Sequence, residues 1–151
     1  MSTPAPIEEV MWGESQERDV VQRWVELSPI GRLAHRFVKC LDFDPYDVLV
    51  LADKGLPLCA LEVKVRRVEF GEYGDVLTPL KKHEFALSMK EMRIPYLLVT
   101  QYACGTLVEV DLGDAPKQTK PIARRDRPGM TPVMHGLWRG KQLRVLSGGP
   151  S

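Results

Sequence analysis

The chain has 151 residues, of which 44% are hydrophobic and 27% charged. This size and composition are typical of one globular domain with a substantial core. No apolar run is long enough to cross a bilayer, and no signal peptide pattern is present, so we expect a cytoplasmic protein without membrane contact. The three cysteines are widely spaced and include no C-x-x-C pair, which argues against a structural zinc site and fits a reducing compartment.

Charge is distributed unevenly along the chain, although the net charge is only +1. Residues 1–112 carry a net charge of −5, whereas residues 113–151 carry +6 and contain recurring prolines. An acidic body with a basic end is typical of a protein that meets a polyanion, although chance bias in a solvated segment would give the same pattern. We therefore divide the chain into a lead-in (1–12), a core (13–112) and a basic, proline-rich C-terminal extension (113–151).

The first predicted element is a helix over residues 15–27. Val20 and Trp24 belong to an apolar stripe at helical spacing, which predicts the buried face of this helix. Glu17 lies on the same face and is therefore expected to point inward. The next segment, residues 32–41, fits either a helix or a strand.

Two strands are predicted next, over residues 46–52 and 58–66, because both runs are rich in β-branched and other apolar side chains. The sequence Asp-Lys-Gly at residues 53–55 separates them and is a turn signal. Antiparallel pairing is the simplest arrangement of two such strands.

The second half of the core begins with a predicted loop over residues 69–78. A Thr-Pro pair then starts a second predicted helix (78–92), in which the threonine is the expected N-cap. Strands are predicted over residues 96–100 and 106–110, and a short strand or hairpin remains open over residues 138–146. This order predicts an α/β or α+β fold with a mixed central β-sheet flanked by helices.

Three polar side chains on the two early strands form a candidate catalytic group. Alternation places Glu62 and Lys64 on one face of their strand, and Asp47 stands at the head of the preceding strand. Two carboxylates and an ammonium in a small volume are suited to hold a divalent metal and activate a water, which predicts phosphodiester hydrolysis. The carbonyl of Val63 and the carboxylate of Glu17 offer further oxygen ligands. A solvated strand face with cross-strand pairing is the alternative explanation for a Glu-x-Lys pattern.

These residues resemble the signature of the PD-(D/E)xK (restriction-endonuclease-like) nuclease superfamily. P-Y-D at residues 45–47 corresponds to the P-D half, with one residue inserted, and E-V-K at residues 62–64 corresponds to the E-x-K half. G-E-S-Q-E-R-D at residues 13–19 is similar to the first-helix motif of archaeal-type Holliday junction resolvases, which also occur in phages. The resemblance covers roughly residues 13–112.

The resemblance implies a restriction-endonuclease-like core, Mg²⁺ (with Mn²⁺ as the alternative) and a homodimer that cuts four-way DNA junctions, in a host cytoplasm if the protein is phage-encoded. The implied catalytic residues are Glu17, Asp47, Glu62 and Lys64. The implied metal ligands are Asp47, Glu62, Val63 and Glu17. The implied DNA-binding residues, which would contact phosphates, are Arg18, Arg66, Arg67, Lys81, Lys82, His83, Arg124 and Arg125. A solvated surface charge is the alternative for each of these cations.

Three other functions remain open at this point. The first is a restriction or repair nuclease on the same fold. The second is a non-catalytic nucleic-acid-binding protein, although the complete set of acidic residues and lysine favours an enzyme. The third is a small structural domain in which the charges coincide by chance.

Overall fold

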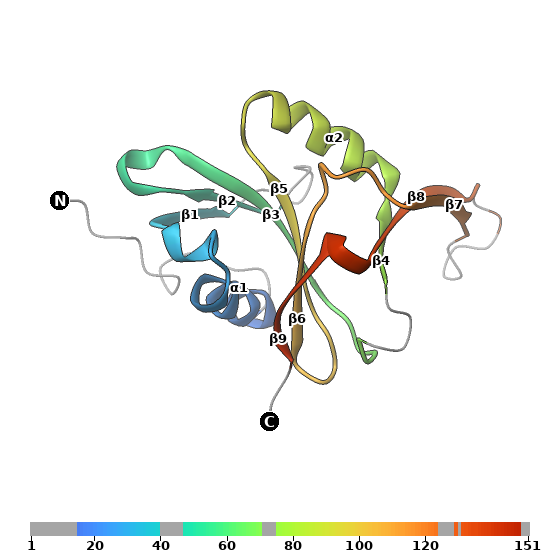
Figure 1. Cartoon of the computed structure of the whole chain (residues 1–151), viewed down its shortest axis with the longest axis horizontal. Coiled ribbons are helices and arrows are strands. Elements are labelled where there is room, and N and C mark those ends of the chain that lie inside the picture. The colour runs from blue at the N-terminus through green and yellow to red at the C-terminus, as the bar shows by residue number, and fades with distance from the viewer. Residues whose placement is uncertain (1–14, 40–46, 71–74, 124–128, 130, 149–151) are drawn as a thin grey trace.

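The fold combines two sheets with two helices. The computed structural model describes residues 15–39, 47–70, 75–123, 129 and 131–148. This part of the chain forms a six-stranded mixed sheet, a three-stranded antiparallel sheet and two α-helices (Figure 1). The predicted α/β class with a mixed central sheet is therefore confirmed. Within these residues, no helix combines the length and the apolar character needed to cross a membrane.

The main sheet has the strand order β1-β2-β3-β5-β6-β9. Its strands are β1 (Arg36–Lys39), β2 (Val48–Leu51), β3 (Pro57–Val65), β5 (Tyr96–Gln101), β6 (Thr106–Asp111) and β9 (Leu143–Gly148). Only β3 and β5 pair in parallel, and the other neighbours are antiparallel. The smaller sheet has the order β4-β8-β7 and consists of β4 (Asp75–Pro79), β8 (Val133–Arg139) and β7 (Gln118–Ile122).

The two helices cover opposite faces of the main sheet (Figure 1). Helix α1 (Ser15–Leu27) has the bounds that the apolar periodicity predicts, and it buries Val20 and Trp24 against β2 and β3. Helix α2 (Leu80–Glu91) buries Ala86 and Met89 against the other face. The face of β3 that carries Ala60 therefore points toward α2, and the alternate face points toward α1.

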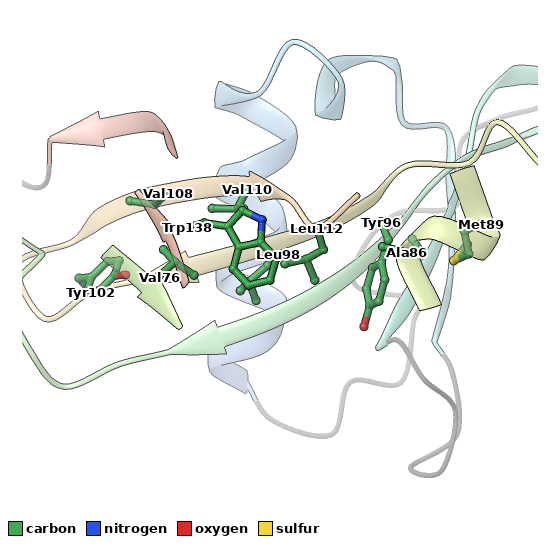
Figure 2. Close-up of a cluster of buried hydrophobic side chains, with 11 residues drawn as sticks. Val76, Ala86, Met89, Tyr96, Leu98, Tyr102, Val108, Val110, Leu112 and Trp138 are labelled. Atoms are coloured by element: carbon green, nitrogen blue, oxygen red, sulfur yellow. The ribbon is translucent and has the colours of Figure 1, made fainter. Parts of the chain in front are cut away.

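The core on the α2 side includes a tryptophan from β8. Trp138 is fully buried beside Leu98 and Val110, and its indole N–H donates to the carbonyl of Asp114 at 2.9 Å (Figure 2). A Cβ on Gly136 would lie 2.8 Å from the Trp138 ring, so only glycine leaves room for this packing. Residues after 113 thus contribute strands to both sheets and a large side chain to the core.

Turn chemistry sets the predicted hairpin between β2 and β3. Lys54 and Gly55 both adopt left-handed backbone conformations, with φ of 67° and 77°, which is the geometry that tight hairpins need. The two strands pair antiparallel with Val48 opposite Leu61, as the sequence predicts. Residues 32–41, which the pattern leaves ambiguous, supply β1 as a further antiparallel neighbour of β2.

One expected loop is a strand. Residues 69–78 were predicted as a loop, but β4 occupies Asp75–Pro79 and pairs with β8, with Thr78 opposite Gly136. Thr78 is therefore a strand residue and not the N-cap of α2, which begins at Leu80. The loop prediction is wrong for residues 75–78, because this strand depends on a partner that is distant in the sequence.

Over residues 138–146, where the sequence leaves a short strand or a hairpin open, the structure has strand residues but no hairpin. Strands β8 and β9 flank a turn at Gly140–Gln142. They do not pair with each other, because β8 joins the small sheet and β9 joins β6 in the main sheet. Strand β7, in a segment rich in proline and charge, was not predicted at all.

Candidate functional site

The candidate site lies where β3 extends beyond its neighbour β2. The last paired residue at that end is Leu61, which faces Val48. The next residues of β3 remain paired with β5 on the other side, with Glu62 opposite Leu98. Asp47, immediately before β2, is held beside this free edge because its N–H donates to the carbonyl of Leu61 at 2.9 Å.

The Asp47 carboxylate is fixed against the backbone of β3. Its Oδ2 accepts a hydrogen bond from the N–H of Val63 at 2.8 Å. The N–H and carbonyl of one strand residue point to the same side, so the Val63 carbonyl also faces the side of Asp47. The two oxygen donors that the sequence assigns to this edge are therefore neighbours.

Glu62 is largely buried, with its side chain 12% exposed. Its Oε2 accepts hydrogen bonds from Lys82 Nζ at 3.3 Å and from the Tyr96 hydroxyl at 3.1 Å. Burial raises the pKa of Glu62, and the Asp47 carboxylate raises it further, whereas Lys82 and Tyr96 act in the opposite direction. The two carboxylates are thus close enough to repel each other.

An open pocket of about 480 Å³ brings the four predicted catalytic residues together. It is lined by Gln16, Glu17, Asp47, Glu62, Val63, Lys64, Val65 and Arg67. The Lys64 ammonium has no hydrogen bond or ion pair to any other residue that the structure describes. Lys64 and Arg67 therefore add two positive charges to the residues that line this acidic pocket.

Glu17 enters the pocket from α1 but is already paired. Its Oε1 lies 2.5 Å from Lys39 Nζ, and the two side chains are 15% and 23% exposed. Lys39 was not predicted as a partner of this carboxylate, because its segment, residues 32–41, fits either a helix or a strand. Its ammonium neutralises the carboxylate that the resemblance assigns as a metal ligand.

The oxygen donors at the edge fit a hard divalent cation. Mg²⁺ usually takes one or two protein carboxylates and leaves its other positions to water and substrate phosphate. Asp47 and Glu62 provide two carboxylates whose mutual repulsion a cation would relieve, and the Val63 carbonyl is adjacent. Among the described residues, no group of three or more His, Cys, Asp or Glu side chains is placed to hold a metal. Glu17, the third carboxylate of the pocket, is paired with Lys39.

No protein-family model, curated protein or solved structure matches this chain. The superfamily resemblance therefore depends on the motif residues themselves. Of these, Glu17, Asp47, Glu62 and Lys64 lie in one pocket, whereas Pro45, Tyr46 and the residues before 15 lie outside the described part.

Two of the predicted DNA-binding residues at the start of α2 make contacts within the fold. Lys82 pairs with Glu62, as described above. His83 donates from Nδ1 to the Leu112 carbonyl at 2.7 Å and meets the edge of Trp138. Their neighbour Lys81 is exposed. At the start of α2, Lys81 is thus the cation presented most openly to solvent.

The remaining predicted DNA-binding residues are divided among several surfaces. Arg67 lines the candidate pocket, whereas Arg66 donates to the Leu77 carbonyl at 3.2 Å and lines a different pocket. Arg18 pairs with its neighbour Asp19, with 3.5 Å between Nη2 and Oδ1. Arg124 and Arg125 lie outside the described residues.

Tyr96 is a second partner of the site that was not predicted. Tyr96 reads as an ordinary strand residue, and only the parallel register of β3 and β5 places it on the same sheet face as Glu62. The hydrophobic run that predicted β5 carries no signal for this register. A hydrogen bond to the candidate ligand is therefore visible only in three dimensions.

Proposed function

We propose that this protein is a metal-dependent endodeoxyribonuclease of the PD-(D/E)xK type, with a restriction-endonuclease-like core, that resolves four-way DNA junctions. The observation that carries this proposal is the gathering of Asp47, Glu62 and Lys64 in one open pocket at the free edge of β3. These motif residues, which a hairpin separates in the sequence, line one pocket, and this supports the proposal. The choice of four-way junctions within this class rests on the sequence resemblance.

Four of the residues that line the pocket would each have a task in phosphodiester hydrolysis. Asp47 and Glu62 would hold Mg²⁺ or Mn²⁺, with the Val63 carbonyl as a further donor. A divalent ion held there would lower the pKa of its bound water and polarise the phosphate. Lys64, which has no partner within the described residues, orients the water and offsets negative charge as the new P–O bond forms and the old one breaks.

Cations around the pocket would position the DNA backbone. Lys64 and Arg67 both line it, and Lys81 is exposed at the start of α2. Binding through phosphates is largely independent of base sequence and weakens steeply with salt. A homodimer would supply the two pockets that paired cuts in a four-way junction need.

The proposal is tested by cleavage of a synthetic four-way junction against matched linear duplex and single strand, with Mg²⁺, Mn²⁺ or EDTA. Paired symmetrical nicks in the junction alone, lost in EDTA, support a junction resolvase. Metal-dependent cutting of linear duplex would retain the nuclease and replace the substrate, in favour of a restriction or repair enzyme.

A non-catalytic DNA-binding protein is the second candidate. The observation that favours it is that Glu17 and Glu62 are each paired with a lysine of the chain, Lys39 and Lys82. Tight junction binding with no cutting under any metal would select this function over the nuclease.

A further inference from the structure

Two of the three carboxylates at the pocket already hold a cation that belongs to the chain. Lys39 pairs with Glu17, and Lys82 pairs with Glu62. Asp47, the third, accepts a backbone N–H instead. A divalent cation that used Glu62 would therefore meet an ammonium group already bound to that carboxylate.

The Lys82–Glu62 pair links α2 to β3. Lys82 belongs to the first turn of α2, and its side chain is 20% exposed, against 12% for Glu62. The adjacent Lys81 is exposed and makes no ion pair to a described residue. Of two neighbouring lysines, only Lys82 is directed to the site.

Accepting the proposed function as its basis, we propose that Lys82 is a positioning residue that holds Glu62 in the metal-free protein and competes with the divalent cation for it. The ammonium contacts Oε2, which is also bound by the Tyr96 hydroxyl. The positive charge of Lys82 repels an incoming cation, and its ammonium group occupies Oε2 of Glu62. Tyr96 carries no such charge and keeps the carboxylate in place after the lysine leaves.

A unit positive charge within hydrogen-bonding distance of a carboxylate changes the equilibrium constant for binding a proton or another cation to that carboxylate by roughly tenfold or more. Lys82→Met removes the charge and keeps an unbranched stem for packing, so its affinity for Mn²⁺ should rise by roughly tenfold over the wild type. Lys82→Gln also lacks the charge but keeps an N–H donor, so it should bind more tightly as well. Lys82→Arg keeps the charge and should bind as the wild type does.

The measurement is calorimetric titration of the full chain with Mn²⁺, without DNA, so that cleavage plays no part. Lys81→Met is the matched control, because it removes the same charge from the neighbouring exposed position, and its affinity should equal that of the wild type. Glu62→Gln in the Lys82→Met background should remove the gain, since the gain acts through Glu62. Melting with and without Mn²⁺ gives a second reading, and the stabilisation by Mn²⁺ should be larger in Lys82→Met and Lys82→Gln than in the wild type.

The outcomes distinguish the role of Lys82 from the existence of the proposed metal site. Tighter binding in both neutral Lys82 variants, or binding in them alone, supports the competition. Wild-type binding that Glu62→Gln abolishes but neither neutral variant strengthens overturns the role of Lys82 and leaves the proposed metal site standing. Absence of Mn²⁺ binding in every variant overturns both the inference and the proposed function.

Discussion

The environment of Glu62 combines burial, a neighbouring anion and a neighbouring cation. Burial is the largest influence, Asp47 adds to it, and both raise the pKa above the ordinary value of glutamate, while Lys82 opposes them. The native protein therefore keeps a proton on Glu62 over a pH range in which the unfolded chain has lost it. Where the native state binds more protons than the unfolded state, stability falls as the pH rises.

This linkage predicts a pH-dependent difference between the wild type and Glu62→Gln. The contribution from Glu62 protonation is fully present below the unfolded pKa of about 4.3 and is lost as the pH rises through the higher native pKa. The free energy of unfolding of Glu62→Gln relative to the wild type should therefore increase with pH across this range. Urea unfolding at a series of pH values measures it. A difference that is constant, or that decreases with pH, would show that the native pKa is not raised.

Helix α1 is attached to the sheet by a buried polar network as well as by apolar contacts. The Glu109 carboxylate on β6 is 4% exposed and accepts hydrogen bonds from Trp24 Nε1 at 3.2 Å and Ser28 Oγ at 3.1 Å. Ser28 Oγ also accepts the backbone N–H of Ile30 and Gly31. One hydroxyl therefore satisfies a buried carboxylate and the turn that follows α1.

Removal of that hydroxyl should destabilise the fold. Ser28→Ala leaves a charged oxygen and two backbone N–H groups with fewer partners, and the expected cost is about 1–3 kcal/mol in the free energy of unfolding. Ser88→Ala, at an exposed position of α2, is the matched control and should change stability little. Chemical denaturation of the two variants makes the comparison. Equal stability of both would mean that the network does not stabilise the attachment of α1.

The elements that the sequence predicts are those that local patterns define. Helix α1 follows from its apolar stripe, and the β2–β3 hairpin follows from a turn with left-handed residues at Lys54 and Gly55. Strand β4 was missed because it is stabilised by pairing with β8, which comes more than 50 residues later in the chain. The contacts of Lys39, Lys82 and Tyr96 with the site acids depend on packing between elements, which a single sequence does not encode locally.

At the scale of the whole molecule, the segment after residue 113 completes the two sheets. Strand β9 pairs with β6 at the edge of the main sheet, and β8 brings the fully buried Trp138 into the core. The basic residues of this segment do not form one patch with the candidate pocket among the described residues. Lys120 lines the pocket that contains Arg66, whereas Arg144 lines another beside Glu109.

A chain that ends at residue 112 should therefore not fold cooperatively. It would expose the edge of β6, leave β4 without a partner, and lose the Trp138 side chain, a loss that by itself costs about 3–5 kcal/mol in a core. That amount is comparable with the whole stability of a small domain. Circular dichroism and a thermal melt of residues 1–112 against the full chain provide the measurement. A cooperative transition in the shorter chain would contradict the assignment of β8 and β9 to the core.

The most direct measurement of the central claim compares junction cutting and junction binding in Asp47→Asn and Glu62→Gln. If the two carboxylates hold the catalytic metal, each variant should lose roughly a thousandfold or more in cutting rate, because several kcal/mol of transition-state stabilisation disappear. Junction binding should remain largely intact. Asp53→Asn, in the exposed turn between β2 and β3, is the control and should cut as the wild type does. Undiminished cutting by both pocket variants would contradict the assignment of this site.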